Sequence, residues 1–203
     1  MKPKVKICGF TNVENARTAS FLGIDAIGLV FYDKSPRCVA VETALEIVKA
    51  LPPFISRVGL FVNADSSFID EVLCEVPLDS LQFHGDELPI NCGQYGMPFI
   101  KALRVTAEMD IAKMAEDYHQ ASGLLLDAFH EKAYGGTGNQ FDWRLAKVEI
   151  DLPIILAGGL NASTVADAIS QVNPYAVDVS SGVESAKGIK DVDKIKQFLA
   201  NIR

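Results

Sequence analysis

Residues 153–182 read PIILAGGLNASTVADAISQVNPYAVDVSSG and contain one complete structural unit. A short apolar run at 153–158 includes the first of two glycines, and a second apolar run occupies 176–180. The residues between them have the spacing of an amphipathic helix, with Asn161 as its expected N-terminal cap. Short apolar runs bounded by turn residues are typical of buried parallel strands, so the stretch predicts a strand–helix–strand unit.

The same alternation extends through the rest of the chain. Six further strand-like runs precede this unit, at 4–8, 26–31, 56–62, 80–83, 98–103 and 123–128. Eight strands alternating with about eight helices suit either a closed (β/α)8 barrel or an open doubly wound sheet. The number of units favours the barrel. We therefore predict an α/β protein in which residues 1–203 form one domain, a single (β/α)8 TIM barrel with short loops.

Composition and charge exclude several classes of protein. The chain is 49% apolar and 22% charged, as is usual for a globular protein. Its net charge of −7 argues against a broad nucleic-acid-binding surface but permits a small anionic ligand at a local site. No apolar run suits a membrane span or a signal peptide. The four cysteines lack metal-ligand spacing, so we expect reduced thiols in a cytoplasmic protein.

Four chemically capable side chains fall at the ends of predicted strands. Cys8 ends the first strand, His84 follows the fourth, Asp127 ends the sixth and Asp178 lies near the end of the eighth. The active sites of (β/α)8 enzymes lie at the carboxyl ends of the strands. We therefore expect these side chains to meet on one face of the barrel.

The last two units carry a candidate phosphate site. Glycines and small hydroxyl residues follow their strands, at positions Gly158, Gly159, Ser180, Ser181 and Gly182. Glycines let backbone N–H groups approach a ligand, and the loops after strands 7 and 8 of such barrels often bind phosphate. The alternative interpretation is two tight turns. The presence of both motifs favours phosphate binding.

Cys8 and Asp127 are a candidate base and acid. A thiolate at the barrel mouth can remove a proton bound to carbon, and a carboxylic acid can protonate oxygen or nitrogen. A carboxylate at the end of a buried strand indicates a specific role, because burial of an unpaired charge costs free energy. The alternatives are a packing cysteine and a carboxylate that caps a helix or forms an ion pair.

Longer motifs occur in a fixed order along the chain. They are KICGFTN (6–12), GLVFYDKSPRCV (28–39), VGLFVN (58–63), LQFHGDE (81–87), LLLDAF (124–129), YGGTGNQFDW (134–143), LAGGLNASTV (156–165) and VDVSSGVE (177–184). In these motifs the chain resembles the phosphoribosylanthranilate isomerase family of tryptophan biosynthesis. The resemblance covers essentially the whole sequence.

The resemblance implies a (β/α)8 barrel that catalyses an Amadori rearrangement. The substrate is the phosphosugar N-(5-phospho-β-D-ribosyl)anthranilate, and the product is 1-(2-carboxyphenylamino)-1-deoxyribulose 5-phosphate. By resemblance, Asp127 protonates the ribose ring oxygen and Cys8 removes the C2 proton. No metal and no organic cofactor is implied. The sequence leaves open whether the chain is a monomer or a homodimer.

The resemblance also assigns substrate contacts. Arg37 matches the arginine expected at the anthranilate carboxylate, for which a guanidinium is well shaped. His84 and Asp178 match family positions near the substrate. The glycine-rich segment 134–138 matches a loop that closes over the substrate. The alternatives are a solvated loop arginine, a histidine with a purely structural role and an ordinary flexible loop.

Three rival functions are compatible with a phosphosugar-binding barrel. A histidine-pathway isomerase would more naturally pair two aspartates, one of them in the position of Cys8. A metal-dependent epimerase would need several histidine and aspartate ligands, whereas the sequence has three histidines. A non-catalytic binding domain would need neither Cys8 nor Asp127. These residues therefore favour the isomerase.

Overall fold

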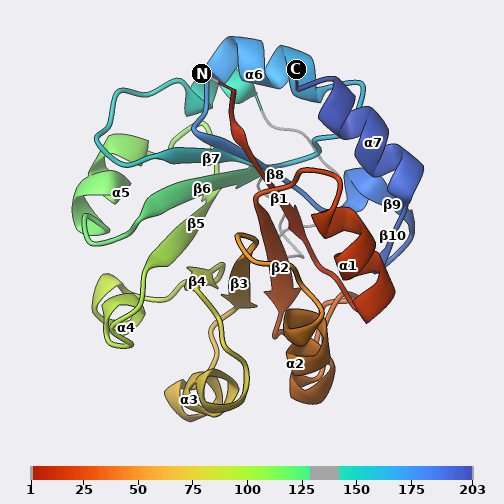
Figure 1. The fold of residues 1–203 in the computed structure, drawn as a ribbon. Coiled ribbons are helices and arrows are strands. Elements are labelled where there is room, and N and C mark those ends of the chain that lie inside the picture. Colours follow the sequence, from red (N-terminus) through yellow and green to blue (C-terminus); the bar gives the residue numbers. More distant parts are fainter. Residues whose placement is uncertain (1, 129–141, 203) are drawn as a thin grey trace.

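The computed structural model describes residues 2–128 and 142–202, and its strands form a closed parallel barrel with helices outside (Figure 1). Strands β1 to β8 follow one another around the barrel in chain order, and β8 pairs with β1 to close it. The N- and C-terminal ends of the chain lie near each other on one side of the molecule (Figure 1). The prediction of a (β/α)8 TIM barrel is confirmed, and the open sheet is excluded.

The barrel strands are short and begin close to their predicted positions. Their bounds are β1 (Lys4–Cys8), β2 (Ala26–Val30), β3 (Ser56–Phe61), β4 (Ser80–Phe83), β5 (Phe99–Val105), β6 (Gly123–Ala128), β7 (Ile154–Leu156) and β8 (Ala176–Val179).

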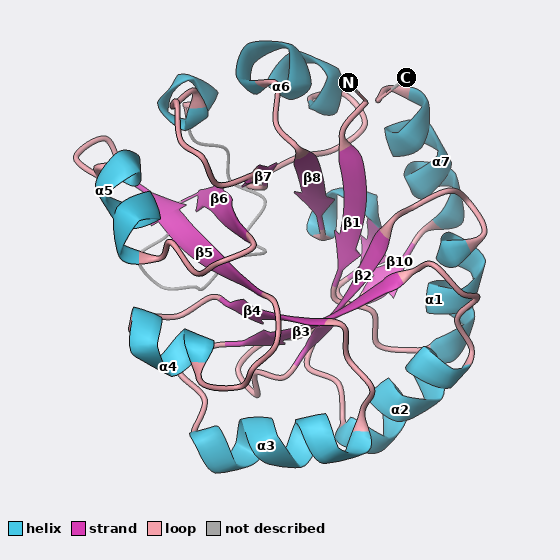
Figure 2. Ribbon diagram, turned by 60° about the vertical axis from the view of Figure 1, so that its left-hand side comes forward, coloured by secondary structure: helices cyan, strands magenta, loops and turns pink. Residues whose placement is uncertain are grey.

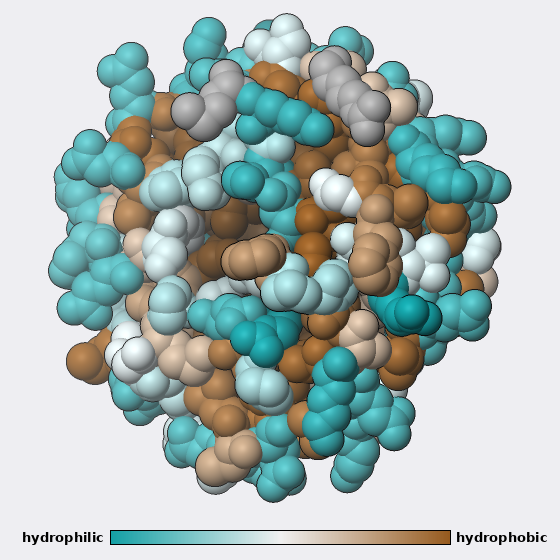
Figure 3. Space-filling model, in the orientation of Figure 1, coloured by the Kyte–Doolittle hydropathy of each residue, from teal (hydrophilic) through white to brown (hydrophobic). Residues whose placement is uncertain are grey.

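The helices lie on the outside of the strands (Figure 2). The described α-helices are α1 (Val13–Ser20), α2 (Val41–Lys49), α3 (Ser66–Glu75), α4 (Pro89–Gly93), α5 (Ile111–Asp117), α6 (Val165–Val172) and α7 (Val192–Ala200). Within the described residues, no helix has the length and apolar character needed to span a membrane. Hydrophilic side chains ring the molecule in Figure 3, as expected for helices that pack on strands by one face only.

Alternation along the strands divides the buried residues into two sets. One set faces the helices and forms the main core, which includes Ile7, Phe83 and Leu126. The other set points into the barrel, because side chains two residues apart share a face of a strand. Apolar interior residues such as Leu125 and Ile155 pack together. A second apolar group inside the barrel, Val30, Leu60 and Val62, packs beside Cys8 and lines the cavity. The polar interior residues are those from which the site is built.

Two local features differ from the prediction. A two-stranded antiparallel sheet, β9 (Glu184–Ala186) with β10 (Ile189–Lys190), follows β8 and was not predicted, because its strands are short and largely polar.

The prediction that Asn161 caps helix α6 is wrong, since the N-cap of α6 is Thr164. The side chain of Asn161 instead accepts hydrogen bonds from the N–H and hydroxyl of Ser163, in a turn before the helix. Between β6 and β7 the described part holds a short 3₁₀ helix, η1 (Trp143–Ala146).

Candidate active site

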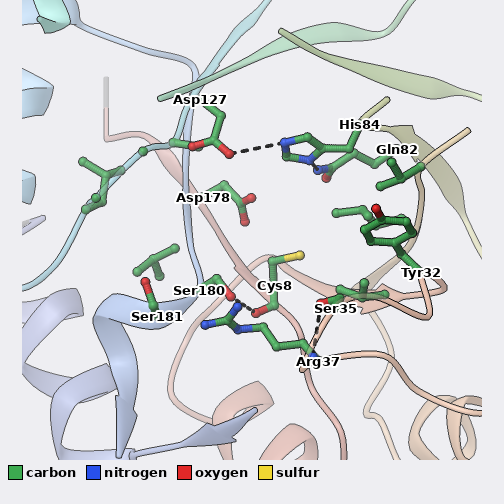
Figure 4. A pocket seen from close by; sticks show the side chains of 18 residues that line it. Cys8, Tyr32, Ser35, Arg37, Gln82, His84, Asp127, Asp178, Ser180 and Ser181 are labelled. Carbon is green, nitrogen blue, oxygen red and sulfur yellow. Dashed lines mark hydrogen bonds and ion pairs between the residues drawn. The ribbon is translucent and has the colours of Figure 1, made fainter. Parts of the chain in front are cut away.

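A polar cavity opens at the carboxyl ends of the strands (Figure 4). The space between its walls is about 680 Å³, counted outward to include the solvent at its open mouth. Its lining includes nine of the ten predicted site residues, namely Cys8, Arg37, His84, Asp127, Gly158, Gly159, Asp178, Ser180 and Ser181. Residues from opposite ends of the sequence meet there because the barrel brings the carboxyl ends of all its strands to the same rim.

Cys8 is the last residue of β1 and is almost completely buried. The chain turns away at once, since Gly9 has a φ of +84°, a value that favours glycine. Cys8 pairs with Gly28 of β2, and a Cβ at Gly28 would lie 2.6 Å from the Cys8 Sγ. The bare glycine therefore makes room for the thiol. Burial raises the pKa of Cys8, and the positive charge of Lys6 opposes part of that rise.

Lys6 and Asp178 form a buried ion pair beneath Cys8. They are register partners on β1 and β8, and Lys6 Nζ lies 3.0 Å from Asp178 Oδ1. Asp178 also lines the cavity, between Cys8 and Asp127 in Figure 4. Burial works against the charge of Lys6, but Asp178 and Cys8 together outweigh it and raise the Lys6 pKa. A positive charge is thereby fixed near the Cys8 thiol.

Asp127 lies at the end of β6, opposite His84. Its Oδ1 accepts a hydrogen bond from the N–H of Ala128 at 2.8 Å, which orients the carboxyl group. Its Oδ2 lies 3.2 Å from His84 Nε2 (Figure 4), although that contact is not aligned as a hydrogen bond. On the other side of the imidazole ring, Gln82 Nε2 lies 3.0 Å from His84 Nδ1. A carboxyl group in contact with the cavity is thus backed by a histidine and an amide.

Arg37 lies on the opposite wall of the cavity and is held by Glu184. Its Nε and Nη2 donate to the two carboxylate oxygens of Glu184, both at 2.7 Å. Glu184 also accepts a hydrogen bond from Lys190 Nζ at 2.7 Å, so two cations share one carboxylate. Burial opposes the charge of Glu184, but Arg37 and Lys190 outweigh it and lower the Glu184 pKa. The group keeps a net positive charge beside the cavity, as an anionic ligand requires.

Lys190 also joins the ends of the first and last barrel strands. Its Nζ donates to the carbonyl oxygen of Cys8 at 2.6 Å, and the hydroxyl of Ser180 donates to the same oxygen at 2.9 Å. The end of β1 and the loop after β8 are therefore fixed to each other. This fixes the backbone of Cys8 relative to the proposed phosphate loops.

The loops after β7 and β8 form one corner of the cavity. Gly158 and Gly159 both have positive φ, at +81° and +67°, and line the cavity with Ser180 and Ser181. Gly182, the tenth predicted residue, does not line it. A Cβ at Gly182 would lie 2.0 Å from the carbonyl oxygen of Leu160, so this glycine lets the two loops touch. The predicted segment 134–138 lies outside the described residues.

Sequence reasoning missed four buried polar residues around the site: Lys6, Gln82, Glu184 and Lys190. For two of these residues the sequence pattern did indicate a place in the site. Lys6 precedes Cys8 by two residues, and Gln82 precedes His84 by two, so strand alternation places each pair on the same face. The other two belong to the unpredicted β9–β10 sheet, and nothing in their local sequence indicates that they reach the site.

The assembled groups can carry out proton transfers on an anionic substrate. A buried thiol and a carboxyl group lie on different walls of one cavity, and Arg37 lies beside the thiol. The glycine–serine loops form the remaining corner. Such a set can add a proton at one atom of a bound phosphosugar and remove one from another.

Comparison with known proteins identifies relatives that match along the whole chain. The sequence model of the family described as N-(5'phosphoribosyl)anthranilate (PRA) isomerase matches residues 5–201. An N-(5'-phosphoribosyl)anthranilate isomerase of Thiobacillus denitrificans is 52% identical over 203 residues, which cover 100% of this chain and 99% of the relative.

Solved structures agree with that result. Phosphoribosyl anthranilate isomerase from Thermotoga maritima superimposes with a TM-score of 0.90 at 42% identity, covering 98% of both chains. A second isomerase structure is a complex with reduced 1-(o-carboxyphenylamino)-1-deoxyribulose 5-phosphate. It has a TM-score of 0.85 at 40% identity, again covering 98% of both chains.

Proposed function

This chain belongs to the N-(5'-phosphoribosyl)anthranilate isomerase family of tryptophan biosynthesis, and we propose that Cys8 and Asp127 are its general base and general acid. The enzyme is an isomerase that converts N-(5'-phosphoribosyl)anthranilate into the corresponding aminodeoxyribulose phosphate. The observation that carries the proposed pair is that both side chains line one cavity with the glycine–serine loops.

The reaction begins at Asp127. Its carboxyl proton passes to the ribose ring oxygen as the bond between C1 and that oxygen breaks. The lone pair of the anthranilate nitrogen forms a C=N bond to C1, which gives a protonated Schiff base. The hydrogen bond from Ala128 to Oδ1 leaves Oδ2 as the oxygen that faces the cavity and His84. General acid catalysis of this kind contributes about 10²- to 10⁴-fold.

Cys8 completes the rearrangement. Its thiolate removes the proton from C2, and the electrons of that C–H bond form a C1=C2 double bond while the C=N electrons return to nitrogen. The resulting enolamine tautomerises to the ketose by gaining a proton at C1 and losing the proton of the C2 hydroxyl. Neither step consumes a redox equivalent, and both proton transfers are assigned to side chains of this chain, so the proposed steps call on no metal and no organic cofactor.

Binding groups hold the two ends of the substrate. We assign the phosphate to Gly158, Gly159, Ser180 and Ser181, with Gly182 keeping the two loops in contact. The substrate's anthranilate carboxylate is assigned to Arg37, whose Nη1 is not used by Glu184. His84 and Asp178 are assigned to the wall around the sugar. With both ends held, the reacting carbons lie between the base and the acid.

A mutation at Arg37 tests the carboxylate assignment. We expect Arg37→Ala to raise KM by at least about 10-fold, since a charge-assisted hydrogen bond is worth about 1.5–3 kcal/mol. Arg144→Ala is the matched control, because Arg144 is an exposed arginine outside the cavity lining. An unchanged KM for Arg37→Ala would remove Arg37 from the carboxylate site.

Location and assembly are part of the proposal. We propose a cytoplasmic enzyme, supported by its four free thiols, of which Cys38 and Cys74 are exposed. For assembly we propose a monomer or a homodimer, and either form is supported by a chain whose own cavity holds both Cys8 and Asp127.

The activity is tested by following the fluorescence of freshly generated phosphoribosylanthranilate. Purified enzyme should consume it far faster than the background hydrolysis, which is measured in parallel and subtracted. Consumption no faster than background would contradict the proposed function. A second assay with a phosphoribosyl substrate of histidine biosynthesis would then test the rival isomerase.

A further inference from the structure

Gln82 is a buried polar residue to which the proposed mechanism gives no role. It lies on β4 with no exposed surface, two residues before His84, so both side chains point into the barrel. Its Nε2 lies 3.0 Å from His84 Nδ1. A side-chain amide nitrogen can only donate, so Nδ1 accepts. The proton of a neutral His84 is therefore on Nε2, the nitrogen that faces Asp127.

Packing alone does not explain an amide at this position. The Oε1 of Gln82 is buried and has no hydrogen-bond partner among residues 2–128 and 142–202. Burying an unpaired acceptor costs free energy, which an apolar side chain of the same size would avoid. Within the described part of the chain, His84 is the one side chain to which the amide bonds. The amide is therefore best explained by what it does to His84.

The tautomer of His84 determines whether the ring nitrogen that faces Asp127 carries a proton. A neutral ring with its proton on Nε2 offers an N–H to Oδ2, which is 3.2 Å away. That N–H can stabilise the carboxylate formed when Asp127 gives up its proton. A doubly protonated ring would instead hold Asp127 as a permanent ion pair and remove the acid from the reaction. The nearby carboxyl group of Asp178 is paired with Lys6.

We propose that Gln82 is a positioning residue of this isomerase, which donates from its side-chain amide to Nδ1 of His84 and so keeps His84 a neutral donor toward Asp127. The inference rests on the proposed role of Asp127 as the general acid. The contact between His84 and Asp127 is not aligned as a hydrogen bond, and we expect it to align when substrate fills the cavity.

The tautomer is measured directly by nitrogen-15 NMR of the enzyme labelled in histidine. The sequence contains three histidines, and a His84→Asn variant assigns the signal of His84. At about pH 7 we expect a bare Nδ1 and a protonated Nε2 in the wild type, with exposed His119 as the internal reference. A proton on Nδ1 of His84 would overturn the proposal, because it would require the amide to accept.

A pair of variants on β4 tests the consequence for catalysis. Gln82→Met keeps the size of the side chain and removes the donor, and Phe83→Leu perturbs the opposite face of the same strand, where Phe83 packs against Phe99. We expect Gln82→Met to lower kcat by about 10- to 100-fold with KM within about twofold of wild type, since misplacing a catalytic group has costs of this order. Phe83→Leu should retain the wild-type kcat.

The outcomes separate this inference from the proposed function. Equal kcat values for Gln82→Met and Phe83→Leu would refute the role of Gln82, even if Asp127→Asn is inactive. Near-normal turnover by Asp127→Asn would refute the acid itself, while the NMR result for His84 would stand. If Gln82→Met unfolds, Gln82→Glu supplies the second variant, because a carboxylate accepts from Nδ1–H and should shift the His84 proton to that nitrogen.

Discussion

Cys8 illustrates how single residues acquire their chemistry from their neighbours. Its position at the end of β1 directs the thiol into the cavity, and Gly28 leaves space for the sulfur. Burial works against the thiolate, while Lys6 and Lys190 favour it, and burial dominates. The raised pKa makes the Cys8 thiolate, once formed, a stronger base than the thiolate of a free cysteine.

The ionisation of Cys8 provides a test at this scale. Because burial raises its pKa, the Cys8 thiol should ionise at a higher pH than a free cysteine thiol does. The measurement is the ultraviolet thiolate absorbance of the wild type minus that of Cys8→Ser, followed as the pH rises. Lys6→Met should move the midpoint further up, because it removes a positive charge. A midpoint below that of a free thiol would contradict this description of the site.

At the scale of elements, the loops after β7 and β8 act together. Gly182 touches the carbonyl oxygen of Leu160, and Ser180 binds the carbonyl oxygen of Cys8. The proposed phosphate corner is therefore tied to β1, where the base is located. A change in the contact between the loops should affect binding of the phosphate before it affects the proton transfers.

Gly182→Ala tests the coupling of the two loops. Its Cβ would overlap the Leu160 carbonyl oxygen, so the loops must separate. We expect KM to rise about 10-fold or more, the equivalent of one weakened hydrogen bond to a charged group, with a much smaller change in kcat. Gly93→Ala is the control, because its Cβ meets only the end of the Gln120 side chain. An unchanged KM in Gly182→Ala would argue against the phosphate corner.

Alternation of apolar runs and helical patterns predicted the barrel strands well, since each strand is buried and bounded by turn residues. The β9–β10 sheet escaped prediction because its polar residues satisfy one another only in three dimensions. Glu184 bonds to Arg37, which is 147 residues away in the sequence. The strand ends and the loops after them likewise predicted eight of the nine predicted residues that line the cavity. The ninth, Arg37, came only from the family resemblance, and Gly182 proved to be a contact between loops. Contacts between residues so far apart in the chain cannot be predicted from the local sequence around either residue.

At the scale of the whole molecule, the barrel closes through polar as well as apolar contacts. The first and last barrel strands share the buried pair Lys6 and Asp178, and Lys190 adds a bond from β10 to the end of β1. A buried ion pair adds little over apolar packing, but breaking one leaves an isolated charge. The site is thus also a part of the structure on which stability depends.

Asp178→Asn should expose this dependence. Loss of the carboxylate leaves Lys6 charged and buried, and we expect the free energy of unfolding to fall by about 3–5 kcal/mol. Urea denaturation measures the change. The double variant Lys6→Met with Asp178→Leu removes both charges and should recover most of the loss. Equal stability of Asp178→Asn and the wild type would show that the pair does not hold the barrel closed.

The central claim is that Cys8 and Asp127 are the base and the acid of one reaction. The most direct test compares the wild type, Cys8→Ser and Asp127→Asn in the fluorescence assay, with binding of the reduced product analogue measured by titration. We predict that each variant binds the analogue within a few-fold of wild type but loses at least about 10²- to 10⁴-fold in kcat. Near-wild-type turnover by either variant would contradict the role proposed for that residue.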